Sequence, residues 1–210
     1  MISVIIPVYN GEKYLGDCLA SVSGKDSEII VIDDASTDNS TSIAKKWTDK
    51  IISVPHAGPV VARNIGIQAA NGEYLLFMDA DDILASGAIQ DMLNQIDDND
   101  VLIGLRQDFV SDDCKTHPTQ TNKKSNHGVI SGCALIKKTA FDIVGLFDED
   151  ILCGDGYDWI LRAQESGAKI KKSDSVFCMR RIHDSNMGRT LKDREYSDYC
   201  KIIKKHFVKK

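Results

Sequence analysis

Short, continuously apolar runs in the first half of the chain predict strands of a parallel sheet that is covered on both faces. The runs are rich in β-branched residues and contain few polar positions, which is typical of buried parallel strands rather than of strands with one solvated face. We expect strands at residues 2–7, 28–32 and 74–78.

Between these runs the apolar residues recur every three to four positions, which predicts helices. In residues 12–22 one stripe collects Tyr14, Leu15, Cys18, Leu19 and Val22. Further helices are expected at residues 40–47 and 60–70, the second entered at Pro59. The alternation of strand and helix predicts an α/β fold whose parallel strands are joined by right-handed crossovers.

The pattern changes after Ala85. A helix is expected around residues 88–96 and a strand around residues 101–105, followed by a polar loop over residues 111–128 and a mixed region of shorter elements. A chain of 210 residues with 42% apolar residues can bury one core but has little material for a second. We therefore expect a single domain.

Polar clusters follow all three strands of the first half. They occupy residues 8–10, 33–36 and 79–82. Because ligands of open α/β sheets bind beyond the carboxyl ends of the strands, these clusters predict one binding site.

The third cluster contains Asp79, Asp81 and Asp82, with no lysine or arginine beside them in sequence. Carboxylates gathered in this way need a cation or protons to offset their repulsion. Mg²⁺ or Mn²⁺ prefers such hard oxygen ligands and typically bridges to a substrate diphosphate. An ordinary solvated turn remains the alternative. In the second cluster, the carboxylate of Asp34 is placed to accept a hydrogen bond from a base N–H.

Net charge and hydropathy exclude some classes of protein. The formal net charge of −5 gives no general attraction to nucleic acid. The apolar opening, residues 1–8, is interrupted by Ser3 and Pro7 and lacks a basic leader, which excludes a signal peptide or membrane span there. We expect a cytoplasmic protein.

Lysines alternate with apolar residues at helical spacing near the C-terminus. This pattern fits a weak contact with a membrane surface or a partner. It fits better a terminal helix whose solvated basic face complements its own dipole. The residues concerned are Lys201, Ile202, Ile203, Lys204, Lys205, Phe207, Val208, Lys209 and Lys210.

The six cysteines are widely spaced and form no CxxC pair, which argues against a disulfide framework and a zinc ribbon. A zinc site from Cys114, His117, His127 and Cys133 is conceivable, but loop residues are the commoner interpretation of this polar region.

Six blocks of sequence together resemble the inverting, GT-A-type glycosyltransferases of family 2, in order and in approximate spacing. The resemblance covers nearly the whole chain. The blocks are VIIPVYNGEKYL (4–15), EIIVIDDASTDNS (28–40), GPVVARNIGIQAANGEYLLFMDADD (58–82), ISGCALIKKTAFDIVGLFDE (130–149), GYDWILRAQESG (156–167) and RRIHDSN (180–186).

The resemblance implies a GT-A fold, with a nucleotide-sugar-binding half over residues 1–82 and an acceptor-side half over residues 83–210. Asp34 would bond the nucleobase, Arg63 would lie near the nucleotide, and Asp81 and His183 would hold the metal. The donor site implied in this way comprises Pro7, Val8, Tyr9, Asp34, Arg63, Asp79, Ala80 and Asp81.

The implied reaction is a single displacement with inversion, in which a base takes the acceptor proton while the metal stabilises the departing diphosphate. Here the chain departs from the family, because counting back from Arg162 puts Gly156 at the position of the base. Asp155 and Asp158 are the candidates, with Asp155 favoured. Flanking glycines would let the backbone carry Asp155 into place, although it would equally serve as a helix N-cap.

The resemblance implies a nucleotide-diphosphate sugar as donor, with UDP as the expected carrier, and a glycan, lipid-linked or protein-borne saccharide as acceptor. Two alternatives remain. A sugar nucleotidyltransferase also uses acidic metal sites, but residues 8–16 lack the glycine-rich basic loop expected of one. A catalytically decayed nucleotide-sugar-binding protein is the other, because of Gly156.

Overall fold

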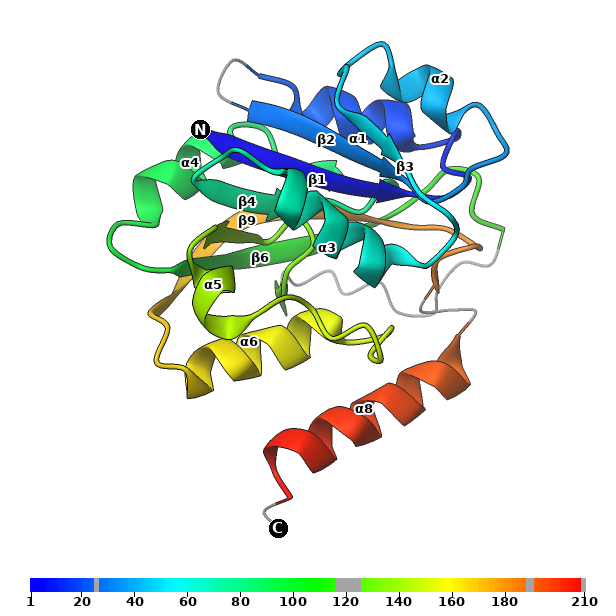
Figure 1. The fold of residues 1–210 in the computed structure, drawn as a ribbon. Coiled ribbons are helices and arrows are strands. Elements are labelled where there is room, and N and C mark those ends of the chain that lie inside the picture. Colours follow the sequence, from blue (N-terminus) through cyan, green and yellow to red (C-terminus); the bar gives the residue numbers. More distant parts are fainter. Residues whose placement is uncertain (25–26, 116–125, 188–190, 209–210) are drawn as a thin grey trace.

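The computed structural model describes residues 1–24, 27–115, 126–187 and 191–208 (Figure 1). In this part of the chain the strands form one sheet in the order β3-β2-β1-β4-β8-β6-β9-β5, and β7 pairs with β6. The strands are β1 Ile2–Val8, β2 Ser27–Asp33, β3 Ile51–Ser53, β4 Tyr74–Phe77, β5 Ile83–Leu84, β6 Val101–Val110, β7 Asn126–His127, β8 Ala134–Lys137 and β9 Ile170–Ile182.

The α/β fold is confirmed, and so is the parallel sheet of the first half. β1 pairs in parallel with β2 and β4, and β2 pairs in parallel with the short β3. The described helices are α1 Leu15–Val22, α2 Ser40–Ala44, α3 Pro59–Ala69, α4 Ala88–Gln95, α5 Ala140–Val144, α6 Asp155–Glu165 and α8 Lys192–His206. Each strand and helix expected in residues 1–96 is present, with ends that differ by up to three residues.

Helices cover both faces of the sheet, and the side chains of β1 alternate between two apolar clusters. Val4 and Ile6 belong to a cluster that includes the buried side chains of α1 and α4. Ile5 belongs to the opposite cluster, with side chains of α3, α5 and α6. Burial on both faces explains why the first strands read as continuous apolar runs.

The second half adds β8 antiparallel to both β4 and β6, so one sheet extends through both halves. The strand before the expected polar loop is longer than predicted, because β6 runs to Val110 and pairs in parallel with β9. The expectation of shorter elements was wrong over residues 170–182, where β9 is 13 residues long. β9 starts with polar residues that lie at or near the surface, and these hide its strand character in the sequence.

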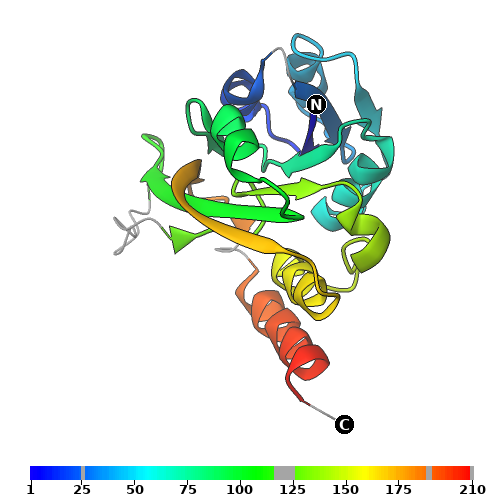
Figure 2. The same ribbon diagram turned by 90° about the vertical axis from the view of Figure 1, so that its left-hand side faces the viewer.

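Helix α8 lies below α6 and extends away from the sheet (Figures 1 and 2). Its cations Lys201, Lys204 and Lys205 are exposed, as expected of a solvated basic face. Two of them also make ion pairs that attach the helix, Lys201 with Asp198 and Lys205 with Asp148 and Asp158. Lys209 and Lys210 lie outside the described residues. Among the helices described, none has the length and apolar character needed to cross a membrane.

Candidate active site

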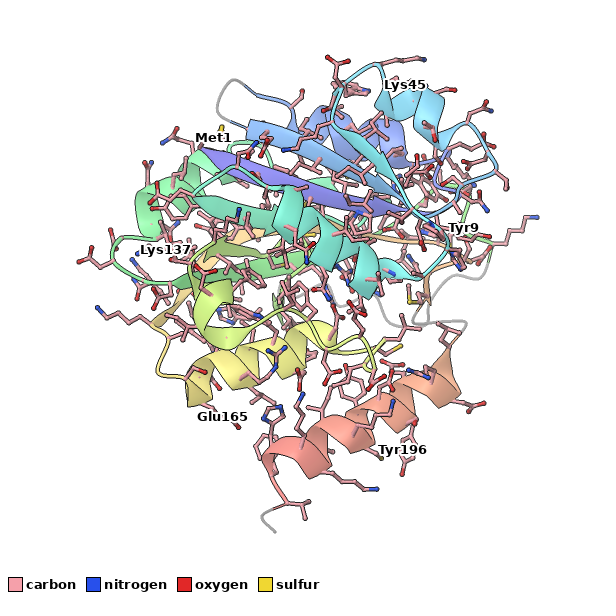
Figure 3. All side chains as sticks on the ribbon, in the orientation of Figure 1. Met1, Tyr9, Lys45, Lys137, Glu165 and Tyr196 are labelled. Carbon is pink, nitrogen blue, oxygen red and sulfur yellow. The ribbon has the colours of Figure 1, made fainter. Side chains whose placement is uncertain are left out.

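The polar clusters that follow β1, β2 and β4 meet at one edge of the sheet, because the three strands are parallel neighbours. Figure 3 labels Tyr9 at this edge, directly after β1. Pro7 and Val8 are buried within β1, whereas Tyr9 is 52% exposed. The chain turns sharply after Tyr9, since Asn10 adopts a φ of +50°. The expected strand-end site is therefore assembled in space.

Arg63 joins the two halves of the chain within this site. It projects from α3, is buried, and donates from Nη2 to Asp79 Oδ1 (2.8 Å) and from Nη1 to Asp155 Oδ2 (2.9 Å). Ser131 Oγ donates to the same Asp79 oxygen at 2.9 Å. The Arg63 guanidinium thus holds Asp79, after β4, beside Asp155, at the start of α6. These two residues are 76 positions apart in the sequence.

Asp81 faces the C-terminal part of the chain. Its Oδ2 lies 2.8 Å from His183 Nε2 and accepts a hydrogen bond from Asn186 Nδ2 at 3.1 Å. His183 Nδ1 lies 3.0 Å from Ser185 Oγ, which fixes the orientation of the ring toward Asp81. The side chain of Tyr14 packs against the His183 ring, with centroids 4.7 Å apart. Asp81 and His183, expected as metal ligands, are therefore in direct contact.

Asp82 has a different role from its two acidic neighbours. It is buried, and its Oδ1 accepts the backbone N–H of Arg181 at 2.9 Å, which ties the cluster to the end of β9. Burial and the nearby charges of Asp79 and Asp81 raise the pKa of Asp82 well above its usual value. The side chain of Arg181 donates to the carbonyl oxygen of Asp81 and pairs with Asp17.

Asp34 organises the turn before α3. Its carboxylate accepts the backbone N–H groups of Ala57 (2.7 Å) and Gly58 (3.0 Å), and His56 Nδ1 lies 2.9 Å from Oδ2. The rings of His56 and Tyr9 pack together, with centroids 4.3 Å apart. A carboxylate has about four acceptor sites, so these contacts leave Asp34 able to accept a further hydrogen bond. Tyr9 and His56 offer an aromatic surface beside it.

Asp155 rather than position 156 faces the site. Gly154 adopts the left-handed conformation, with a φ of +91°, and α6 begins at Asp155. A Cβ atom at Gly156 would lie 3.1 Å from Ile130 Cγ1, so this position packs against the protein interior. Burial raises the pKa of Asp155, and the positive charge of Arg63 offsets this only in part. Asp155 is therefore a carboxylate held by Arg63 beside Asp79, with its pKa above the usual value.

Asp158, the other carboxylate considered as base, lies away from this cluster. Its side chain is fully buried, accepts from Arg162 Nε at 2.8 Å, and lies 2.9 Å from His206 Nε2 and from Lys205 Nζ. These partners belong to α6 itself and to α8. The contacts of Asp158 attach one helix to the other, and they differ entirely from those of Asp155.

The donor set at the strand ends fits Mg²⁺ or Mn²⁺. Asp81 supplies a partly exposed carboxylate and His183 an imidazole, and Asp79 and Asp82 lie close enough for their charges to interact. In the described part of the chain, no three His, Cys, Asp or Glu side chains are grouped as a ready metal set. Ala80, between Asp79 and Asp81, is partly buried against the core.

The zinc site considered for the polar loop has no support in the described residues. Cys114 Sγ lies 3.6 Å from Asp184 Oδ1, and Cys133 is buried beside Cys178. His117 lies outside the described residues. All six cysteines are free thiols.

Four side chains complete the site without having been singled out from the sequence: His56, Ser131, Arg181 and Asn186. The last three lie inside blocks that carry the family resemblance, so their sequence context was a usable signal. His56 had no such signal, because its contact with Asp34 depends on how the chain after β3 returns to the end of β2.

Comparison with known proteins agrees with the fold. A model of "Glycosyl transferase family 2" matches residues 3–145. An uncharacterized glycosyltransferase of Rickettsia typhi is 31% identical over 215 residues, covering 90% of this chain and 66% of the relative. A second, from Rickettsia prowazekii, is also 31% identical and is covered to 70%. The poly(ribitol-phosphate) β-N-acetylglucosaminyltransferase TarS of Staphylococcus aureus is 35% identical over 114 residues, which cover 48% of this chain and only 20% of TarS.

Solved structures share the fold. TarS residues 1–349 in complex with UDP-GlcNAc align with a TM-score of 0.73 and 23% identity, covering 99% of this chain and 68% of that one. A mannosyltransferase of Pyrobaculum calidifontis in complex with GDP-Man and Mn²⁺ aligns with a TM-score of 0.70 and 18% identity, covering 100% of this chain and 64% of that one.

Proposed function

The chain belongs to glycosyl transferase family 2, and from this premise we propose that it transfers a sugar from a UDP-sugar to a hydroxyl group of a glycan acceptor. The transfer inverts the anomeric configuration and depends on Mn²⁺ or Mg²⁺. Residues at the ends of β1, β2 and β4 bind the donor, and a residue at the start of α6 removes the acceptor proton.

One observation carries the proposal. Arg63 hydrogen-bonds both Asp79, at the end of β4, and Asp155, at the start of α6. A transferase needs the departing diphosphate and the base that activates the acceptor on opposite sides of one sugar, within a few ångströms of each other. The Arg63 bridge supports this arrangement, because it brings Asp79, two residues from the proposed metal ligand Asp81, beside the proposed base Asp155.

The reaction assigns a role to each of these residues. The Asp155 carboxylate accepts the proton of the acceptor hydroxyl as that oxygen bonds to the anomeric carbon, and the bond from the anomeric carbon to the diphosphate oxygen breaks. Arg63 orients Asp155 and contributes positive charge beside the diphosphate. Asp81 and His183 would hold the divalent metal, which would supply positive charge to stabilise the leaving UDP.

UDP is the carrier we propose, with Asp34 reading the base and Tyr9 and His56 forming the surface on which it stacks. Asp34 retains acceptor capacity, which suits the N–H group of uracil. The structural relative TarS is described in complex with UDP-GlcNAc, whereas the archaeal mannosyltransferase is described with GDP-Man. UDP-GlcNAc is therefore the first donor to test, with GDP-Man as the competitor.

Binding and turnover together test the proposal. Thermal shift is measured with UDP, GDP and CMP, each with Mn²⁺, Mg²⁺ or chelator, and UDP release from UDP-GlcNAc is then followed. We expect the largest stabilisation from UDP with Mn²⁺ or Mg²⁺, and its loss with chelator, because diphosphate and the acidic cluster otherwise repel each other.

Asp81→Asn and Asp98→Asn form a matched pair for this test. Both remove one carboxylate charge, but Asp98 is exposed and lies between α4 and β6, at the opposite edge of the sheet. Asp81→Asn should abolish metal-dependent UDP binding and turnover, whereas Asp98→Asn should leave both unchanged. Equal UDP affinity with chelator and with Mn²⁺ would contradict metal dependence. Binding without any turnover of sugar nucleotides would favour a decayed binding protein.

A further inference from the structure

The segment that leads into α6, residues 150–154, is held by the C-terminal helix. The carboxylate of Asp198 in α8 is fully buried, and its Oδ2 accepts the backbone N–H groups of Leu152 (2.9 Å) and Cys153 (3.1 Å). A buried carboxylate that takes two main-chain donors fixes the path of that main chain.

Two cations of α8 bind the same segment from either side of Asp198. Arg194 Nη2 and Lys201 Nζ donate to the carbonyl oxygen of Asp150, at 3.0 and 2.8 Å. Each also bonds Asp198, at 2.9 Å, and so offsets its buried charge. Burial alone would raise the pKa of Asp198, but the bonds from Lys201, the Cys153 amide and Arg194 lower it to about 2. Asp198 is therefore charged throughout the physiological range, and with its two cations it forms what we call the Asp198 latch.

The latched segment ends at the candidate base. Cys153 precedes Asp155 by two residues, and between them Gly154 takes its left-handed conformation against α8. A Cβ atom at Gly154 would lie 3.0 Å from Ile202 Cδ1 and 3.4 Å from Tyr199 Cε1. The position at which α6 begins, and hence the direction of the Asp155 carboxylate, is set on this surface of α8.

We propose that Asp198 is a positioning residue for sugar transfer, which acts through residues 150–154 to hold Asp155 against Arg63. This inference rests on the proposed function, because it takes Asp155 as the base. Asp198 has no contact with the strand-end cluster among its hydrogen bonds in the described residues, all of which go to residues 152–153 and to α8.

The other attachment of α8 provides a matched control. His206 lies 2.9 Å from Asp158 Oδ1 and 2.8 Å from Glu165 Oε1, both in α6. His206→Gln therefore loosens the last turn of α8 without removing a bond to residues 150–153. If Asp198 served only to keep α8 docked, the two substitutions would have similar effects on turnover.

The experiment compares Asp198→Asn with His206→Gln in the full chain, by amide hydrogen exchange and by UDP release from UDP-GlcNAc. We expect Asp198→Asn to speed exchange at the amides of Leu152 and Cys153 and to lower kcat by about 10- to 100-fold, since small displacements of a base are costly. The donor KM and UDP affinity should change less than about twofold, because the donor site is not involved. His206→Gln should leave those two amides and kcat near wild type.

A double-mutant cycle with Asp155→Asn separates positioning from general loss of structure. If Asp198 acts through Asp155, the double variant turns over no more slowly than Asp155→Asn alone. If the losses of kcat in the two single variants multiplied in the double variant, or if folded Asp198→Asn kept its kcat, the inference would be overturned.

Should Asp198→Asn not fold, the milder Arg194→Gln, which removes a bond to Asp150, serves in its place with the same expectations. A wild-type rate in Asp155→Asn would instead overturn the base assignment of the proposed function, a separate and recognisable outcome.

Discussion

At the residue scale, the packing of Gly156 gives a physical reason for the proposal that the base stands one position earlier than the family resemblance implies. A side chain at position 156 would meet Ile130, because a Cβ atom there would lie 3.1 to 3.3 Å from the Cβ, Cγ1 and Cδ1 atoms of Ile130. An aspartate there would have to displace this side chain and would lose its hydration. Asp155 instead leaves the left-handed Gly154 toward Arg63, so the same chemical group is supplied from the neighbouring position.

Asp155→Asn should therefore lower kcat by about 10²–10⁴, the usual contribution of a positioned general base. UDP and metal binding should stay near wild type, because neither is held by Asp155. Steady-state kinetics and calorimetry on the same preparation measure the two effects. Asp158→Asn gives the contrast: it breaks a buried network with Arg162 and His206, so its main effect should be a lower midpoint of thermal unfolding. An undiminished rate in Asp155→Asn would mean that the proton leaves by another route.

The pH dependence of kcat provides a second test of Asp155. Burial raises its pKa above the ordinary value of 3.8, with Arg63 lowering it only in part. Because the base must be deprotonated to accept a proton, the rate should fall on the acid side, with the midpoint above pH 3.8. The positive charge of Arg63 lowers the pKa of Asp155, so Arg63→Gln should shift the acid-side fall in kcat to higher pH. A fall centred at or below pH 3.8 in the wild type would contradict the assignment.

At the scale of elements, the close approach of α3 to β1 places Arg63 over the ends of the strands. Gly66 in α3 makes this approach possible, because a Cβ atom there would lie 2.3 Å from Ile5 Cγ2 in the fully buried β1. Gly66→Ala gains about 1 kcal/mol of helix propensity, but overpacking of a core side chain typically costs about 1–3 kcal/mol. At a contact this short we expect the overpacking cost to exceed the gain in helix propensity, so the free energy of unfolding should fall.

Gly16→Ala in α1 is the control for this effect, since nothing lies within 4 Å of a Cβ atom there. It should leave stability unchanged or raise it by up to about 1 kcal/mol. Denaturant unfolding of both variants measures the difference. If Gly66→Ala were as stable as Gly16→Ala, the packing of α3 on β1 would not require glycine at position 66.

The elements that could be predicted from the sequence are those whose burial is uniform along their length. β1, β2 and β4 are covered on both faces and show it in their composition, and Arg63, Asp79 and Asp81 follow from the strand ends and the family blocks. β9 could not be predicted, because its first half carries surface lysines and an aspartate and is recognisable only from its pairing with β6. The Asp34 to His56 contact and the Asp198 latch likewise depend on long-range packing.

At the scale of the whole molecule, α8 is joined to the body by two groups of charges along its buried side. The first, around Asp198, holds the segment before α6. The second, in the last turn, joins Lys205 and His206 to Asp148, Asp158 and Glu165. The opposite side of α8 leaves large apolar side chains exposed, among them Tyr196, which Figure 3 labels on the outer side of the helix. Charged groups therefore hold this helix in place together with the apolar contacts of Ile202 and Tyr199.

The attachment of α8 should consequently depend on pH. Burial alone would lower the pKa of His206, but its contacts with Asp158 and Glu165 outweigh this effect and raise the pKa above 6.5. Lys205 also contacts Asp158; its own pKa is raised, so it stays charged. A group whose pKa is raised on folding stabilises the folded state fully below its unfolded value, and this contribution is lost as pH rises through the folded pKa. We expect exchange protection of the last turns of α8 to be constant below about pH 6.5 and to fall at higher pH. In His206→Gln this fall should be absent, because glutamine does not titrate. If protection fell with pH by the same amount in His206→Gln, the pH dependence would come from groups other than His206, and this prediction would be wrong.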